Sequence, residues 1–449
     1  MLSNGREVGI LIQGINFVIV KDYHFIVYKI LIDFEKSKNQ LKGIRDKYFD
    51  KFDSISLNEK SRVVVLTNEV VKWRRKLDFC ITKNLNNSLN KTNYRLLTIL
   101  RIGYYELLFD EKAPNYAVVN YWVSFTKKII NNKVGGFSNA VLRKAEVLIP
   151  NNKDTIEHIG INFSYPKWII IKWQNQFGKQ DTIKLCKFFN LIPKFYIRLP
   201  NSTSHNDFFE KFFLKKSFKS DNFYKVKSGL NKIIHSNYFI KNNCSVQDRA
   251  SGAVVELLNP KPGKIVLDVC AAPGTKTNYI ADIMGESGKI FASDTDLERI
   301  KIGKKRSESL SLNIHWSQKN AEKDNFIIAD YILIDAPCSG TGVMGKRVDI
   351  RWRRKKEDII LFCKTQINML NNMSRFLNKG GTIVYSTCSL ENEENWNVVS
   401  QFIKLNNNFR LDSPKGLIPS SWIDRNNCMQ TLPYRDSVDG MFAARLIKQ

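Results

Sequence analysis

The hydrophobic pattern of this chain changes its period once, and this change limits the folds that the chain can adopt. Up to about residue 150, apolar residues recur at the spacing of one helix face, as at Val63, Leu66 and Val70. After Asn259-Pro260, short β-rich runs alternate with helical runs. Such alternation is typical of a parallel sheet covered by helices. The sequence therefore predicts an all-α N-terminal domain followed by an α/β domain.

The helical part has several predicted boundaries. Residues 8–20 keep helical spacing and are shorter than the roughly 20 residues that a membrane span needs, so we expect a buried first helix there. One helix should end at Ala113-Pro114, and Gly135-Gly136 should break the next. The polar segment 151–162 is interpreted as a linker, and 168–190 as a further helix.

We divide the chain into a helical domain over residues 1–150, a small basic connecting module over 163–245 and a sheet domain over 246–449. A strand is expected at 195–199, inside the module. The expected strands of the sheet domain are 265–269, 290–293, 331–334, 383–386 and 441–446, and its expected helices are 277–284, 296–310 and 357–377.

The composition indicates a polyanionic partner. The 449 residues include 70 Lys and Arg against 43 Asp and Glu, which gives a formal net charge of +27, and 43% are hydrophobic, which excludes a disordered chain. The positive excess indicates either nucleic acid or an anionic membrane surface as partner. Abundant Lys, Asn and Ile also fit the drift of an AT-rich genome, and composition alone does not separate these readings.

The eight cysteines form no C-x-x-C pair, and no His is spaced to share a zinc ion with them. We therefore expect neither a disulfide framework nor a metal site. Since no segment has the pattern of a membrane span or of a signal peptide, we expect a cytoplasmic protein with no membrane partner, and a monomer.

A run of small residues follows the first strand of the predicted sheet. Residues 268–277 read Asp-Val-Cys-Ala-Ala-Pro-Gly-Thr-Lys-Thr, and the absence of large side chains lets a ligand approach the backbone closely. The run contains neither G-x-G-x-x-G nor G-x-x-x-x-G-K. Asp294 ends the second strand, where an acidic residue can accept hydrogen bonds from both ribose hydroxyls; the alternative is a helix N-cap.

Two cysteines follow the next two strands of the sheet. Cys338 lies in Asp335-Ala336-Pro337-Cys338, directly after one strand, and Cys388 follows Thr387 at the end of another. The two positions are one strand-helix-strand unit apart, and neighbouring strands lie about 4.8 Å from each other. We therefore expect both thiols to face one crevice.

These features resemble a known family of enzymes. The last 200 or so residues are similar to the RNA cytosine-5 methyltransferases that use S-adenosylmethionine, whose hallmarks are a Pro-Cys and a Thr-Cys motif, here Pro337-Cys338 and Thr387-Cys388. Residues 101–108, 117–120 and 136–143 resemble the NusB-like RNA-binding fold. The fusion of the two, with the closing residues 439–446, is similar to the bacterial ribosomal RNA small subunit methyltransferase B family.

The resemblance implies a NusB-like domain joined to a Rossmann-like methyltransferase domain that acts on carbon 5 of a cytosine in small-subunit (16S) ribosomal RNA. It also implies that Cys388 is the attacking thiol and Cys338 the thiol that assists release. Carbon 5 is a poor nucleophile, but addition of a thiolate at carbon 6 makes an enamine that can accept a methyl group. Lys276 is a candidate for activating Cys388, and Asp335 for bonding the cytosine edge, its alternative being to hold a turn.

The cofactor implied by the resemblance is S-adenosylmethionine. The implied cofactor-binding residues are Cys270, Ala271, Ala272, Pro273, Gly274, Thr275, Lys276, Asp294, Asn320 and Asp335. Thr275 stands where the family has a second Gly, and Asn320 where it has Asp. Since Thr tolerates positive φ badly, the path of the loop is expected to differ at Thr275. Gly345 and Val348 also depart from the family pattern, replacing an Arg and a Pro.

Several alternatives remain open from the sequence. The same chemistry could act on transfer RNA, or the chain could be a non-catalytic RNA-binding or antitermination factor, although both cysteines argue against the latter. A nicotinamide-dependent oxidoreductase would need the missing glycine fingerprint. The arginines of 349–354 are candidate phosphate contacts, the alternative being a solvated basic face.

Overall fold

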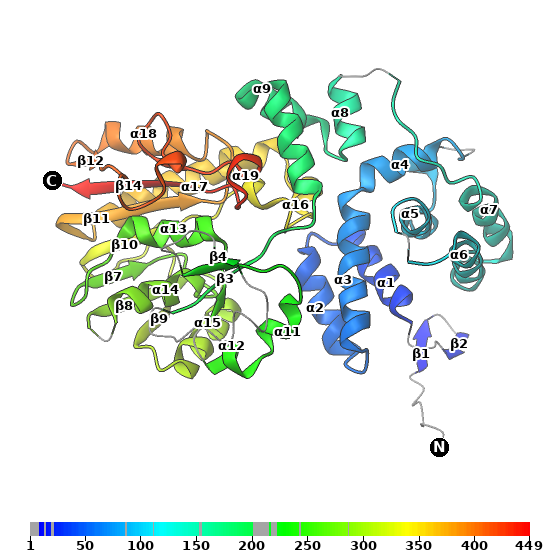
Figure 1. The fold of residues 1–449 in the computed structure, drawn as a ribbon, viewed down its shortest axis with the longest axis horizontal. Helices are drawn as coiled ribbons and strands as arrows, with labels where there is room; N and C mark the ends of the chain where they lie inside the picture. The colour runs from blue at the N-terminus through cyan, green and yellow to red at the C-terminus, as the bar shows by residue number, and fades with distance from the viewer. Residues whose placement is uncertain are drawn as a thin grey trace. The chain divides into compact units, whose positions relative to one another are not determined.

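The computed structural model describes residues 22–85, 88–110, 112–151, 155–200, 222–241, 244–285 and 287–449, and the backbone of 9–12, 15–18 and 215–216. The chain forms two compact units (Figure 1). Unit 1 comprises Met1–Cys186 with Arg351–Arg353, and unit 2 comprises Lys187–Ile350 with Arg354–Gln449. The predicted division with a connecting module over 163–245 remains a proposal.

Unit 1 is helical, as the sequence predicts. Its central helix is α5, which contacts α1, α3, α4, α6 and α7 and buries most of its length. The helices are α1 (Tyr23–Lys36), α2 (Leu41–Lys51), α3 (Leu57–Lys72), α4 (Arg74–Thr82), η1 (Leu89–Lys91), α5 (Tyr94–Leu108), α6 (Asn115–Ile129), α7 (Asn132–Leu142), α8 (Ile156–Asn162) and the first part of α9 (Lys167–Asn190).

The helix predicted over residues 8–20 is wrong. The described backbone there forms an antiparallel pair of strands, β1 (Gly9–Ile12) and β2 (Ile15–Val18). The segment is rich in β-branched Ile and Val, which lose side-chain freedom in a helix and favour strands. In so short a run, helical spacing does not outweigh this preference.

The break predicted at Gly135-Gly136 is also wrong, because α7 runs through both glycines. The chain instead breaks after α6, and Asn131 caps α7 by accepting a hydrogen bond from the Val134 amide at 2.9 Å. A Cβ on Gly135 would lie 2.3 Å from Cγ of Lys127 on α6. Gly135 therefore serves close packing of two helices rather than a turn.

The linker predicted over 151–162 is wrong in its second half, where α8 forms. Thr155 caps this helix through the His158 amide at 3.0 Å, and Ile159 and Ile161 are buried. The predicted helix over 168–190 is confirmed as α9, which is kinked at Gly178, where φ is 79°.

Unit 2 is built on an eight-stranded sheet of order β12-β14-β11-β10-β7-β8-β9, with β13 paired to β14. Its five predicted strands are confirmed. The strands are β7 (Ile265–Asp268), β8 (Lys289–Asp294), β9 (Ile314–Gln318), β10 (Ala329–Asp335), β11 (Leu377–Thr387), β12 (Phe409–Leu411), β13 (Met429–Gln430) and β14 (Phe442–Lys448). The sequence missed β9, which is a mostly exposed edge strand, and β12 and β13, which are very short.

Helices cover both faces of this sheet (Figure 1). They are α13 (Arg249–Leu258), α14 (Thr275–Met284), α15 (Leu297–Ser309), α17 (Lys356–Ser374), α18 (Trp396–Leu405) and α19 (Pro433–Asp436), with the 3-10 turns η2 (Thr341–Val343) and η3 (Ser420–Trp422). The short helix α16 (Ile350–Arg353) is divided between the units, with all but its first residue in unit 1. Alternate residues of β10 enter different cores: Leu333 packs with α13 and α14, whereas Ile332 and Ile334 pack with α17 and α18.

The strand order places the site. Strands β11, β10, β7, β8 and β9 are parallel, and the direction of chain progression reverses between β7 and β10. In sheets of this kind ligands bind at the carboxyl ends of the strands beside such a reversal. The predicted site residues follow these strands.

A small antiparallel sheet of order β4-β5-β3-β6 also belongs to unit 2. The strand predicted at 195–199 is confirmed as β3. The elements are β3 (Tyr196–Arg198), β4 (Lys215–Lys216), β5 (Phe223–Lys225), α11 (Leu230–Ile234), α12 (Asn237–Lys241) and β6 (Ser245–Val246). Buried Arg198 joins this sheet to α14 through Asp282 at 2.8 Å and the ring of Tyr279.

Within the described part of the chain, no helix combines the length and the apolar character that a membrane crossing requires. The same residues contain no group of three His, Cys, Asp or Glu side chains that could hold a metal ion.

A half-buried histidine, His24, makes the stability of unit 1 depend on pH. His24 Nε2 lies 3.0 Å from Glu106 Oε1, and Nδ1 lies 3.2 Å from Asp22 Oδ1. Burial lowers the pKa of His24, but its interactions with the two carboxylates outweigh burial and raise the pKa to about 9. The stabilisation of the folded protein by protonated His24 is complete below the pKa of about 6.5 that His has in the unfolded chain. It is lost as the pH rises through the pKa of about 9 in the folded protein.

We therefore expect the thermal unfolding midpoint of the wild-type protein to decrease as the pH rises from about 6.5 to about 9.5. Deprotonation of His24 should lower the free energy of unfolding by about 3 kcal/mol over this range. His24→Gln should show a lower midpoint at the acidic end and a smaller fall. The control is His158→Gln, whose ring lies 3.1 Å from the Pro150 carbonyl oxygen. Equal pH dependence in the wild type and His24→Gln would contradict this assignment.

Candidate active site

The loop of small residues connects β7 to α14. It turns at Gly274, where φ is 98°, and a Cβ there would lie 3.1 Å from the Trp316 ring. Thr275 is already the first residue of α14 and is not among the residues with positive φ. The expectation that Thr275 diverts the loop is therefore wrong, because Gly274 takes the left-handed conformation.

Asp294, at the end of β8, holds this loop in place. Its carboxylate accepts hydrogen bonds from the amides of Ala272 and Asp296, both at 3.1 Å. The N-cap of α15 is Asp296, which accepts from the Arg299 amide, so the N-cap alternative for Asp294 is wrong. The guanidinium of Arg299 in turn donates to the Ala272 carbonyl.

Asp268, at the end of β7, was not singled out from the sequence. Thr277 Oγ1 donates to its Oδ2 at 2.7 Å, whereas its Oδ1 is buried without a hydrogen-bond partner. Burial raises the pKa of Asp268 to about 7. An unpaired buried carboxylate oxygen beside a loop of small residues indicates a place for a polar ligand.

Asn320 follows β9, and its side chain is already engaged in a turn. Its Oδ1 accepts from the Glu322 amide at 2.8 Å, and its own amide donates to Asp324 at 2.7 Å. Contact of Asn320 with adenine remains a prediction. Together, the narrow loop, the two strand-end carboxylates and the unpaired oxygen of Asp268 fit a cofactor with a ribose and a charged amino-acid end.

The two cysteines lie together at the ends of adjacent strands. Strands β10 and β11 are parallel, with Asp335 opposite Ser386. The Sγ atoms of Cys338 and Cys388 are 3.4 Å apart. This is within hydrogen-bond distance for sulfur, so a thiol on one can donate to a thiolate on the other.

Lys276 and Asp335 form an ion pair beside the sulfurs. Lys276 Nζ lies 2.6 Å from Asp335 Oδ2, and Ser386 Oγ donates to Asp335 Oδ1 at 2.8 Å. Burial lowers the pKa of Lys276, but the carboxylate of Asp335 outweighs burial and raises it above its ordinary value. Lys276 is therefore a fixed positive charge, and side chains rather than a turn engage the Asp335 carboxylate.

The surroundings favour the thiolate on Cys388. The hydrogen bond from Cys338 lowers the pKa of Cys388, whereas burial and the Asp335 carboxylate raise it. Lys276 and Arg347 lower it further, and the net shift is downward. The same hydrogen bond raises the pKa of Cys338 well above its ordinary value, and burial and Glu394 raise it more. Burial strongly raises the pKa of Cys270, which is therefore a neutral thiol in the loop between β7 and α14.

A buried carboxylate next to the cysteines escaped the sequence analysis. Glu394 is fully buried, and it accepts hydrogen bonds from the Ser339 amide at 2.8 Å and from Ser389 Oγ at 2.6 Å. Ser339 and Ser389 directly follow the two cysteines. The only sequence signal was an acidic run after the Thr-Cys motif, which looks like a solvated turn.

The rear of the Cys338 loop packs against the chain before β14. The Gly342 amide donates to the Cys388 carbonyl, and the Gly440 amide to the Gly342 carbonyl, both at 2.9 Å. A Cβ on Gly342 would lie 2.0 Å from the Gly440 oxygen, so no other residue fits without displacement.

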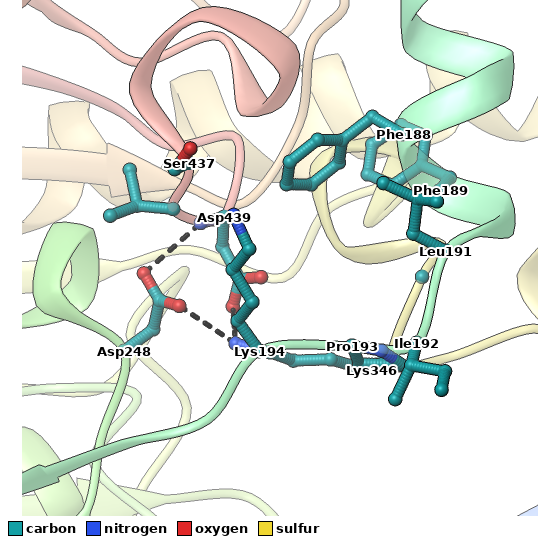
Figure 2. A pocket seen from close by; sticks show the side chains of 12 residues that line it. Phe188, Phe189, Leu191, Ile192, Pro193, Lys194, Asp248, Lys346, Ser437 and Asp439 are labelled. Atoms are coloured by element: carbon teal, nitrogen blue, oxygen red, sulfur yellow. Dashed lines mark hydrogen bonds and ion pairs between the residues drawn. The ribbon is translucent and has the colours of Figure 1, made fainter. Parts of the chain in front are cut away.

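Lys346 lines a small pocket (Figure 2). There it holds Asp439, the residue before Gly440, and so supports the contact between Gly342 and Gly440. Its ammonium lies 2.7 Å from Asp248 and 2.8 Å from Asp439, which Figure 2 draws as dashed lines. Burial raises the pKa of Asp439 to about 7, and the ammonium of Lys346 opposes this rise. Phe188 and Leu191 line the opposite side of the pocket.

The arginines of 349–354 serve the protein interior. Arg351 is fully buried with its guanidinium 4.0 Å from the Tyr165 ring centroid, and Arg353 donates to the Phe34 carbonyl. Arg354 Nε donates to the Ser339 carbonyl at 3.0 Å. For Arg351 both sequence readings, phosphate contact and solvated face, are wrong, because its charge is covered by protein.

Known proteins match both parts of the chain. A family model described as 16S rRNA methyltransferase RsmB/F matches residues 255–447, and one for the NusB family matches residues 25–146. Ribosomal RNA small subunit methyltransferase B of Photorhabdus laumondii is 28% identical, and the match covers 88% of this chain and 92% of the relative.

Two solved structures share the fold. A structure named PH0851 has a TM-score of 0.79 at 24% identity, covering 95% of this chain and 98% of the other. NSun6 of Pyrococcus horikoshii, solved with the ligand SFG, has a TM-score of 0.56 at 23% identity, covering 63% of this chain and 98% of the other.

The order of domains, the sheet topology and the family matches agree. The predicted fold class and cofactor are thereby confirmed. The chain is an S-adenosylmethionine-dependent ribosomal RNA methyltransferase, in which residues 255–447 match the RsmB/F family and residues 25–146 match the NusB family.

Proposed function

We propose that this enzyme methylates carbon 5 of one cytosine in 16S ribosomal RNA through a covalent adduct with Cys388. The observation that carries this proposal is the 3.4 Å separation of the Cys338 and Cys388 sulfurs at the ends of β10 and β11. Methylation of an exocyclic amine or of a ribose hydroxyl has no use for two adjacent thiols. Carbon 5 of a pyrimidine needs one nucleophile and benefits from a second proton acceptor.

Cys388 begins the reaction. Its thiolate, favoured by Cys338 and Lys276, adds to carbon 6 of the cytosine and shifts electron density to carbon 5. S-adenosylmethionine, when bound, supplies the methyl group as an electrophile. Carbon 5 then forms the new carbon–carbon bond and still carries its proton.

Asp335 is proposed to orient the base. Its carboxylate is 30% exposed, unlike its partner Lys276, so one face remains available to a ligand. It can accept a hydrogen bond from the exocyclic amine of cytosine, while Lys276 holds it in place. The residues from Cys270 to Gly274, with Asp294, are proposed to hold the methionine and ribose parts of the cofactor.

Cys338 is proposed to act in product release. Once Cys388 is bonded to carbon 6, its negative charge has gone, and this removes the largest cause of the raised pKa of Cys338. Cys338 can then lose its own proton to solvent, and its thiolate accepts the carbon 5 proton. The electron pair of that carbon–hydrogen bond restores the ring double bond and expels the sulfur of Cys388.

The RNA must present the base outside its stack, because carbon 6 is inaccessible within a helix. The NusB-family domain and the net charge of +27 support binding of structured RNA. This substrate would place the enzyme in the cytoplasm with the ribosome.

The reaction is tested by transfer of labelled methyl to unmodified 16S ribosomal RNA and, separately, to transfer RNA, with bisulfite mapping of the product. We expect one 5-methylcytosine in 16S RNA for the wild type and none for Cys388→Ala, which should still bind the cofactor. Cys363→Ala, on α17, is the matched control and should retain activity. Modification of transfer RNA alone would show that transfer RNA, not 16S ribosomal RNA, is the substrate. Activity of Cys388→Ala would refute the assignment of Cys388 as the nucleophile.

Cys338→Ala should add to cytosine and transfer the methyl group but release product slowly. We expect a protein–RNA adduct that survives denaturing electrophoresis and contains labelled methyl. The same gel with Cys338→Ala/Cys388→Ala should show no adduct. Free turnover by Cys338→Ala would remove this residue from the release step.

Lys276→Met should move the pH–rate profile to higher pH. Without the ammonium, the pKa of Cys388 rises and less thiolate is present at neutral pH. A pKa higher by one pH unit lowers the thiolate fraction, and with it the rate at pH 7, by about tenfold. Lys276→Arg keeps the charge and should restore most of the profile. An unchanged profile for Lys276→Met would show that Lys276 does not activate the thiol.

A further inference from the structure

We propose that Glu394 is a positioning residue: one buried carboxylate holds the Cys338 and Cys388 loops at a fixed spacing and keeps Cys338 as the hydrogen-bond donor of the pair. This inference rests on the proposed function, since it assigns how the two thiols are kept in different protonation states. Glu394 touches neither sulfur in the described contacts and acts through the residues that follow each cysteine.

The donors to Glu394 come from three separate segments. Ser339 supplies its amide and its hydroxyl, and Ser389 supplies its hydroxyl. Gln366 Nε2, from α17, donates to Glu394 Oε1 at 3.2 Å and to the Pro337 carbonyl at 3.0 Å. The two serine hydroxyls are themselves 3.0 Å apart. A single carboxylate therefore fixes both cysteine loops and anchors them to a helix.

The site of Glu394 is also fixed from behind. Its carbonyl accepts a hydrogen bond from Tyr385 at 2.5 Å, and the next residue, Asn395, donates to the Ser389 carbonyl at 2.9 Å. Thr387 Oγ1 donates to Asn395 Oδ1 at 2.6 Å. The turn between β11 and α18 is thus tied to the strand that carries Cys388, and Glu394 has little freedom to move.

Burial of the Glu394 carboxylate costs desolvation free energy that an uncharged link between the two loops would not cost. Glu394 is fully buried, and no residue that the structure describes forms an ion pair with it. Neutral donors alone compensate its charge, although an uncharged side chain could link the same loops without desolvating a carboxylate. A buried charge retained without a cation points to a role for the charge itself.

That role is asymmetric between the two thiols. The charge of Glu394 raises the pKa of Cys338, whereas the charges that act on Cys388 come from Asp335, Lys276 and Arg347. The negative charge of Glu394 therefore favours the proton on Cys338. On Cys388, Lys276 and Arg347 lower the pKa against the opposing carboxylate of Asp335. Cys338 then donates to the Cys388 thiolate across the 3.4 Å contact. The geometry and the charges both favour a protonated Cys338 and a thiolate at Cys388.

The test compares Glu394→Gln, which removes the charge, with Glu394→Asp, which keeps it. Glu393→Gln is the matched control because Glu393 is exposed and adjacent in sequence. Two quantities are measured on the full-length enzyme: kcat and KM for methyl transfer, and the pH dependence of iodoacetamide alkylation at each cysteine, resolved by mass spectrometry without RNA. Cofactor binding reports folding.

We expect Glu394→Gln to lower kcat by about 100-fold with little change in KM, as for a misplaced reacting group. The alkylation midpoint of Cys338 should move down by about one pH unit, while that of Cys388 moves less. Glu394→Asp should keep the Cys338 midpoint and recover part of kcat. Glu393→Gln should match the wild type in both.

Ser389→Ala is the milder variant if Glu394→Gln does not bind cofactor. It removes one donor from the Cys388 loop and keeps the charge, so kcat should fall at an unchanged Cys338 midpoint. Wild-type kcat in both Ser389→Ala and Glu394→Asp, or an unmoved Cys338 midpoint in folded Glu394→Gln, would overturn the inference. Failure of the wild type to methylate cytosine would refute the proposed function instead, because alkylation is measured without RNA.

Discussion

Parallel pairing of β10 with β11 is the constraint on which the candidate site depends. The register places Asp335 opposite Ser386, and the pairing continues past the strand ends through the Ala336 amide, which donates to the Ser386 carbonyl at 2.8 Å. Because parallel strands end on the same edge of the sheet, the loops that carry Cys338 and Cys388 begin side by side. The sulfurs meet because backbone hydrogen bonds leave the two loops no other path.

The charges around the sulfurs then decide what the pair can do. Lys276 reaches the same edge from the first turn of α14, since Gly274 lets the chain turn directly from the loop after β7 into the helix. Its ion pair with Asp335 puts one cation and one anion beside the thiols and leaves Asp335 partly exposed. Lys276 therefore connects the loop between β7 and α14 with the thiol pair, so the geometries of the two are coupled.

Sequence patterns predicted those parts of the molecule that local rules determine. The five predicted strands of the sheet are short apolar runs, and the chemistry-bearing residues stand directly after them. The edge of the sheet on which these residues lie could therefore be inferred before any coordinates.

The sequence patterns failed where packing overrides local preference. Gly135 looks like a helix break but lets α6 approach α7, and β9 is too exposed to show an apolar run. The burial of Glu394 and Arg351 could not be predicted for a related reason. Charged residues next to other charged residues look like solvent-exposed turns, and only tertiary structure shows that both side chains are fully buried.

The resting state of the thiol pair follows from these placements. Two sulfurs 3.4 Å apart cannot both carry a negative charge in a buried crevice without strong repulsion, so one proton is shared between them. The hydrogen bond between the sulfurs lowers the pKa of Cys388 and raises that of Cys338. The cations near Cys388, which act against Asp335, and the Glu394 carboxylate near Cys338 add to this difference. In the proposed reaction, bonding of Cys388 to carbon removes the largest cause of the raised pKa of Cys338. In the proposed reaction, the order of attack and release therefore follows from fixed charges in the fold.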